Sequence, residues 1–133
     1  MIKWKENDGG RVDAGFSPTH GACVYRAVSI VTEESYKEVH DELLKLSLED
    51  NPKHEGSGVQ FHVLDKYMEK RGWKWTDARR PFPPQNELMP KKTVAALATD
   101  HLVACIDGMF QDTHDFTEGP GAGRKIEGYY EKA

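Results

Sequence analysis

Hydrophobic residues in the first half of the chain recur at the spacing of helices that bury one face. From residue 22 they follow an i, i+3, i+4, i+7 pattern, at Val24, Ala27, Val28 and Val31. A second stretch, "SYKEVHDELLKLSLED", opens with a capping box of Ser35 and Glu38. A third covers about 59–71 and stops at Gly72. We therefore expect three helices between residues 22 and 71.

The second half of the chain has the composition and alternation of strands. "WKW" at 73–75 predicts a short strand, and "KTVAALA", "HLVACI", "MFQDTH" and "KIEGYYE" predict four more. Asp107 and Gly108 separate "HLVACI" from "MFQDTH" and form a two-residue hairpin signal. The stretch "ARRPFPPQNELMP" holds four of the seven prolines, so we expect an irregular connector there.

The order of these elements predicts the fold class. Residues 1–18 mix glycine with charge and predict an arm or loops, with a short strand at "IKWK". A helical part over 19–72 then precedes a sheet part over 73–133, which indicates an α+β protein with a mostly antiparallel sheet. A chain of 133 residues suits a single domain that folds without disulfides or a structural metal.

Charge and hydropathy narrow the classes of function. The net charge is -4 with both signs mixed along the chain, which argues against a protein that binds nucleic acid through its charge. The first residues, "MIKWKENDGGR", hold no apolar run of the kind a signal peptide needs, and no apolar stretch approaches about 18 residues. We expect a cytoplasmic protein outside the membrane, in which Cys23 and Cys105 stay reduced.

The expected hairpin places a histidine beside a carboxylate. With the turn at 107–108, alternate side chains share one face of the two strands, at His101, Val103, Cys105, Phe110, Asp112 and His114. Asp112 is then the diagonal neighbour of His101, whereas Asp115 points the other way. A register slip of one residue would reverse the choice, and we favour Asp112.

Cys23 lies in the first turn of the first expected helix. A helix N-terminus favours negative charge, so a thiol there has a lowered pKa. A carboxylate bonded to one ring nitrogen of His101 would raise the basicity of the other. Placed together, Cys23, His101 and Asp112 would supply a nucleophile, a base and an orienting acid. The alternative for Cys23 is a buried structural thiol, which is the role we expect for Cys105.

A metal site is the competing chemistry. His20, Cys23, His101 and His114 could supply tetrahedral zinc ligands, but "H-x-x-C" without a second paired motif is a weak signal. We favour the thiol site and expect neither a metal nor a cofactor. Arg26 lies one turn after Cys23, and we expect it to pair with a carboxylate such as Asp13.

The motifs "GACVYRA" and "HLVACIDGMFQDTHD" resemble, in that order, two elements of the papain-like cysteine peptidases. The residues of the two motifs are most similar to those of small papain-like proteins of phages and prophages, and "IEGYYE" resembles the strand that closes such domains. The likeness covers about 13–130. It implies a papain-like fold in which Cys23 is the nucleophile, His101 the general base and Asp112 the orienting acid.

The resemblance fails at one position. The family commonly carries a glutamine shortly before the cysteine, where it helps bind the oxyanion, and the polar residues nearby in this chain are Ser17, Thr19 and His20. The resemblance implies a thiol hydrolase acting on a peptide, isopeptide or amide bond of a peptide or protein substrate. The alternative is an inactive papain-like binding protein, for instance a phage factor that inhibits a host protein in the host-cell cytoplasm.

Overall fold

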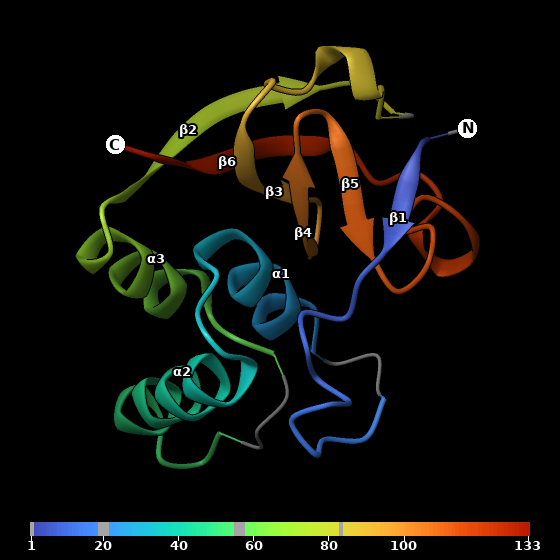
Figure 1. Cartoon of the computed structure of the whole chain (residues 1–133). Coiled ribbons are helices and arrows are strands. Elements are labelled where there is room, and N and C mark those ends of the chain that lie inside the picture. The colour runs from blue at the N-terminus through green and yellow to red at the C-terminus, as the bar shows by residue number, and fades with distance from the viewer. Residues whose placement is uncertain (1, 19–21, 55–57, 83) are drawn as a thin grey trace.

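Three helices and one six-stranded mixed sheet make up the α+β structure that a computed structural model gives for residues 2–18, 22–54, 58–82 and 84–133. The helices are α1 (Cys23–Thr32), α2 (Tyr36–Asp50) and α3 (Phe61–Lys70). The strands are β1 (Trp4–Glu6), β2 (Trp73–Arg80), β3 (Thr93–Ala98), β4 (His101–Ile106), β5 (Met109–Asp112) and β6 (Ile126–Lys132). They lie in the order β1-β5-β4-β3-β6-β2. Figure 1 shows the helices gathered on one side of the sheet, with α1 between the sheet and α2.

The predicted helices are present, with small differences at their ends. α1 begins at Cys23 and buries the predicted stripe, Val24, Ala27, Val28 and Val31. The side chain of Ser35 caps α2 as expected, because its hydroxyl accepts the backbone N–H of Glu38 at 3.3 Å. α3 is shorter than predicted, since it begins only after Gln60 and ends at Lys70.

The β4–β5 hairpin has the predicted turn and register. Ile106 pairs with Met109 and Cys105 with Phe110. Asp107 and Gly108 both have positive φ angles, 52° and 81°, as a type I′ turn requires. The side chain of Asn86, in the short 3-10 helix η2 (Asn86–Leu88), donates to the carbonyl of Gly108 at 2.7 Å and holds the turn.

One sequence-based prediction about the strands needs correction. β2 is eight residues long and continues beyond "WKW" into the stretch expected to be an irregular connector. It continues because β6 pairs with it as far as Arg80, across an irregularity between Asp77 and Arg80. The short strand expected at "IKWK" is present as β1, which pairs in parallel with β5. The sheet is therefore mixed, although its other pairings are antiparallel.

The sheet is covered on both faces. Toward the helices, Ala95, Leu102, Ala104 and Tyr130 join the core formed by α1, α2 and α3. The opposite face carries a second apolar cluster that includes Val103, Cys105, Phe110 and Phe116. Cys105 has 0% of its surface exposed, as expected for a core residue. β4 therefore lies in the middle of a packed structure, which fixes the position of its first residue, His101. None of the helices in the described part of the chain is long and apolar enough to cross a membrane.

Candidate active site

The Cys23 thiol lies where α1 meets β4. Cys23 is the first residue of α1, and its side chain is half-buried. The N–H groups of a first helical turn have no acceptor within the helix and carry partial positive charge, which stabilises a thiolate. The thiol also accepts a hydrogen bond from the backbone N–H of Leu102, the second residue of β4. The start of the helix is thus brought directly against the start of the strand that carries His101.

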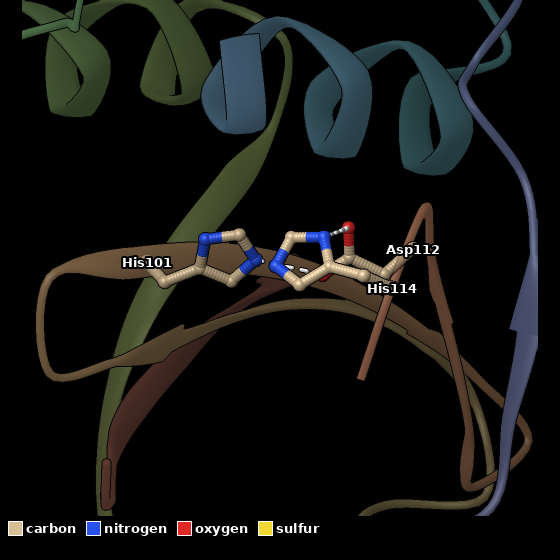
Figure 2. Close-up of side chains that lie close together, drawn as sticks. All are labelled: His101, Asp112 and His114. Carbon is tan, nitrogen blue, oxygen red and sulfur yellow. Dashed lines mark hydrogen bonds and ion pairs between the residues drawn. The ribbon is translucent and has the colours of Figure 1, made fainter. Parts of the chain in front are cut away.

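His101 joins the thiol to a carboxylate. Its Nε2 atom lies 2.7 Å from Oδ2 of Asp112, and Figure 2 shows this contact between the two side chains. The same ring is hydrogen-bonded to the Cys23 thiol. Because Asp112 occupies Nε2, the nitrogen available to the thiol is Nδ1. The ring of Phe116 stacks on His101 at 5.8 Å between centroids and limits how far the imidazole can turn.

The surroundings favour the charged forms of the thiol and the imidazole. Burial opposes ionisation of Cys23, but the hydrogen bond and charge of His101, then Leu102 and Arg26, outweigh it and lower the pKa of the thiol. Burial likewise disfavours the imidazolium of His101, yet its bonds to Asp112 and Cys23 raise its pKa to about 9. Both shifts favour the thiolate–imidazolium form of the pair over the neutral form.

Asp112 is held from several directions. It is 4% exposed, and its Oδ1 accepts the backbone N–H of Thr113 at 2.7 Å. Its backbone carbonyl accepts the N–H of Asn7 at 2.8 Å, so the arm that contains β1 also fixes its position. Burial would raise the pKa of the Asp112 carboxyl, but the bond to His101 and its charge lower it below the ordinary value. The carboxylate thus stays ionised.

The preference for Asp112 over Asp115 as the partner of His101 is confirmed. Asp115 instead accepts the backbone N–H and the hydroxyl of Thr117, at 2.9 and 2.6 Å. These bonds close a turn after β5 and leave Asp115 no part in the contact with His101. The register of the hairpin, predicted from the turn at 107–108, decides which carboxylate meets the ring.

The expected partner of Arg26 was wrong. Asp13 is exposed, and the carboxylate that Arg26 meets is that of Asp112, with Nη2 3.7 Å from Oδ1. The spacing offered a signal for this contact, since Arg26 follows Cys23 by three residues and so lies on the same side of α1. The strand partner could not be identified before β5 was placed beside the helix.

Of the three residues expected near the oxyanion, Ser17, Thr19 and His20, the structure describes only Ser17. Ser17 is exposed, and its backbone carbonyl accepts Nε of Arg11 at 2.6 Å. Thr19 and His20 lie outside the described residues. One donor that the described residues offer is the backbone N–H of Cys23, which lies at the start of α1 and has no acceptor within the helix.

One group of side chains has the spacing of a metal site. His101, Asp112 and His114 each offer a ligand atom, and these atoms lie within 4.8 Å of one another. Figure 2 shows His114 joined to the same carboxylate as His101, and its Nδ1 lies 3.8 Å from Oδ1 of Asp112. A cation here would meet the buried guanidinium of Arg26 and would displace the bond between His101 and Asp112. The arrangement suits a charged thiol site better than a metal centre.

Comparisons with protein-family models, with curated proteins and with solved structures gave no match to this chain.

Proposed function

We propose that the protein is a papain-like thiol hydrolase that cleaves a peptide, isopeptide or amide bond. The observation that carries the proposal is the position of His101, whose ring contacts the Cys23 thiol and the Asp112 carboxylate at once. A nucleophile, a base and an acid that orients the base are the parts that covalent acyl transfer needs.

The geometry supports a two-step reaction. The Cys23 thiolate attacks the carbonyl carbon, and the imidazolium of His101 gives its proton to the leaving nitrogen as the carbon–nitrogen bond breaks. This step leaves a thioester and releases an amine. Water then attacks the thioester carbon and gives a proton to His101, and the carbon–sulfur bond breaks to release a carboxylic acid and restore the thiolate. Asp112 holds the ring through both steps without changing its own charge.

The oxyanion formed in each step needs a hydrogen-bond donor. The backbone N–H of Cys23 lies at the N-terminus of α1, where it has no acceptor within the helix. A single such donor contributes about 100- to 1000-fold to the rate in well-studied enzymes. The remaining donors would come from the stretch before Cys23, where the resemblance expects a glutamine and this chain has none.

The arrangement of elements is compatible with the papain-like fold that we propose. The cysteine begins a helix that packs on an antiparallel part of the sheet, the histidine begins a strand, and the aspartate lies on the neighbouring strand. These are the elements on which the resemblance of "GACVYRA" and "HLVACIDGMFQDTHD" rests.

Alkylation of the thiol tests the proposal. Iodoacetamide reacts with thiolates, so wild-type Cys23 should be labelled rapidly at about pH 6, well below the range of an ordinary thiol. His101→Ala should abolish the rapid labelling. His62→Ala is the matched control, because His62 is exposed and pairs with Asp50 far from the thiol in sequence. If Cys23 reacts only near the ordinary pKa of a thiol, the result contradicts the proposal.

A non-catalytic binding protein is the second candidate. The specific observation in its favour is the absence of a glutamine between Asp13 and Cys23. Such a protein would bind its partner equally well as wild type and as Cys23→Ser, and would produce no new peptide termini in a digest of unfolded proteins. Cleavage that depends on Cys23 would exclude this candidate and support the hydrolase.

A further inference from the structure

We propose that Arg26 is a positioning residue that compensates the charge of the buried site and keeps Asp112 aligned with His101; this inference rests on the proposed hydrolase. Arg26 is not a reacting group. It holds Asp112 through their ion pair, and its charge favours the thiolate of Cys23, so it adds a fourth residue to the three that the resemblance supplies.

The contact spans the two halves of the site. Arg26 lies one helical turn after Cys23 on α1, whereas Asp112 is the last residue of β5. The guanidinium Nη2 lies 3.7 Å from Oδ1, and Oδ2 of the same carboxylate bonds to His101. Asp112 is thus held between the helix of the nucleophile and the strand of the base. An arginine is suited to this role because it stays charged when buried.

Burial distinguishes this ion pair from the others. Among the described residues, the pairs of Asp112 with Arg26 and with His101 are the only ones in which both side chains are less than a tenth exposed. Exposed ion pairs contribute little because water screens them. Removing one partner of a buried pair, by contrast, leaves an uncompensated charge in a medium of low dielectric.

A count of charges shows what Arg26 adds. In the reactive form the site holds a thiolate on Cys23, an imidazolium on His101 and a carboxylate on Asp112, which together carry one negative charge. The guanidinium of Arg26 brings the sum to zero. Without it, the reactive form would bury a net charge, so the protonated thiol would be favoured at a given pH.

The other charged groups around the site do not replace Arg26. His114, in the segment after β5, lies 3.8 Å from Oδ1 of Asp112 and contributes to the lowered pKa of that carboxyl, but its side chain is 44% exposed, so water screens this interaction more than that of the buried Arg26. Tyr36 of α2 is a further titratable group near Arg26. Burial raises the pKa of its hydroxyl, and the charges of Arg11 and Arg26 offset only part of this rise. Arg11 itself donates to the hydroxyl of Tyr36 at 2.5 Å.

The N-terminal arm supports both members of the pair. The N–H of Asn7 donates to the carbonyl of Asp112, and Gly9 packs so closely on α1 that an added Cβ would lie 2.8 Å from the carbonyl oxygen of Arg26. One short loop therefore fixes the backbones from which the carboxylate and the guanidinium extend. Fixed backbones hold the carboxylate and the guanidinium in a constant relative position, as a positioning role for Arg26 requires.

The test compares the pH dependence of Cys23 alkylation in Arg26→Gln, Arg26→Lys and wild type. We expect the midpoint for Arg26→Gln to rise by about one pH unit, so that labelling at about pH 6 slows roughly tenfold. Arg26→Lys keeps the charge and should restore most of the shift. Arg71→Gln is the matched control, because Arg71 pairs with Glu34 and Glu42 outside the site and its loss should leave the midpoint unchanged.

The outcomes separate this inference from the proposed function. An ordinary thiol midpoint in the wild type would overturn the hydrolase, whereas a low midpoint shared by wild type and Arg26→Gln would overturn only the role of Arg26. If Arg26→Gln alone does not fold, the double variant with Asp112→Asn answers the question. Recovery of the fold supports charge compensation, and continued failure to fold overturns it, because Arg26 would then be needed for packing.

Discussion

The carboxylate of Asp112 lies 2.7 Å from Nε2 of His101 and thereby turns the other ring nitrogen toward Cys23. The two residues come from neighbouring strands of one hairpin, and their contact depends on the register that the turn at 107–108 sets. A hydrogen bond between rigid strands fixes both the tautomer and the orientation of the imidazole. The thiol on α1 needs only to reach a ring that is already in place.

Replacing Asp112 by asparagine should slow alkylation of Cys23. The amide keeps the shape of the side chain but removes the charge that favours the imidazolium, so we expect about a tenfold slower reaction with iodoacetamide at about pH 6. Asp115→Asn is the control, because Asp115 bonds only to Thr117 among the contacts described above. Equal rates for the two variants would show that the carboxylate on β5 does not act on His101.

The imidazole of His101 should titrate well above the ordinary range. Its pKa of about 9 follows from the bonds to Asp112 and Cys23, which outweigh the effect of burial. We expect NMR of the ring carbons to show the imidazolium persisting through neutral pH and deprotonating near pH 9. In Cys23→Ser the pKa should fall, because the thiolate that stabilises the imidazolium is gone. An unchanged pKa in that variant would contradict a direct interaction.

Cys105 should remain unreactive while the protein is folded. Burial raises the pKa of its thiol to about 12, against smaller opposing effects of the Gly108 backbone and Lys91. Native protein should therefore take up a single alkyl group, on Cys23, as measured by mass spectrometry of the digested chain. Labelling of Cys105 should appear only after unfolding in urea. Labelling of both thiols at similar rates in the native state would be inconsistent with this core.

Gly9→Ala should destabilise the fold more than Gly15→Ala. Both glycines have positive φ, 70° and 95°, so each alanine bears the cost of a left-handed backbone, about 1 kcal/mol. Only at position 9 would the new Cβ press against Arg26, whereas nothing lies within 4 Å at position 15. We expect an additional loss of about 1–3 kcal/mol in the free energy of unfolding, from urea titrations. Equal losses would mean that the loop does not pack on α1 as described.

The local parts of the structure could be predicted from the sequence because local chemistry determines them. The capping box at Ser35 sets the start of α2, and the turn at Asp107 sets the register that brings Asp112 to His101. Contacts between distant segments left no comparable signal. The parallel pairing of β1 with β5 and the extension of β2 depend on where β5 and β6 lie in the sheet.

In the candidate site, too, local sequence patterns predicted the separate parts but not the contacts between distant segments. Cys23 at a helix start and the pair of His101 and Asp112 follow from local patterns. The meeting of the two halves, and the contact of Arg26 with Asp112, come from the packing of α1 against β4 and β5. Spacing along the chain could place Arg26 on the side of α1 that carries Cys23, but could not identify the carboxylate opposite.

The ultraviolet absorbance of the Cys23 thiolate measures directly whether the contact with His101 lowers the pKa of the thiol. The difference in absorbance between wild type and Cys23→Ser, followed as pH rises, reports ionisation of Cys23 without a reagent or a substrate. We expect the midpoint of the thiolate signal in the wild type to lie below the ordinary thiol value of 9.0, and His101→Ala to move that midpoint upward. A midpoint at the ordinary value in the wild type, unchanged by His101→Ala, would contradict this expectation.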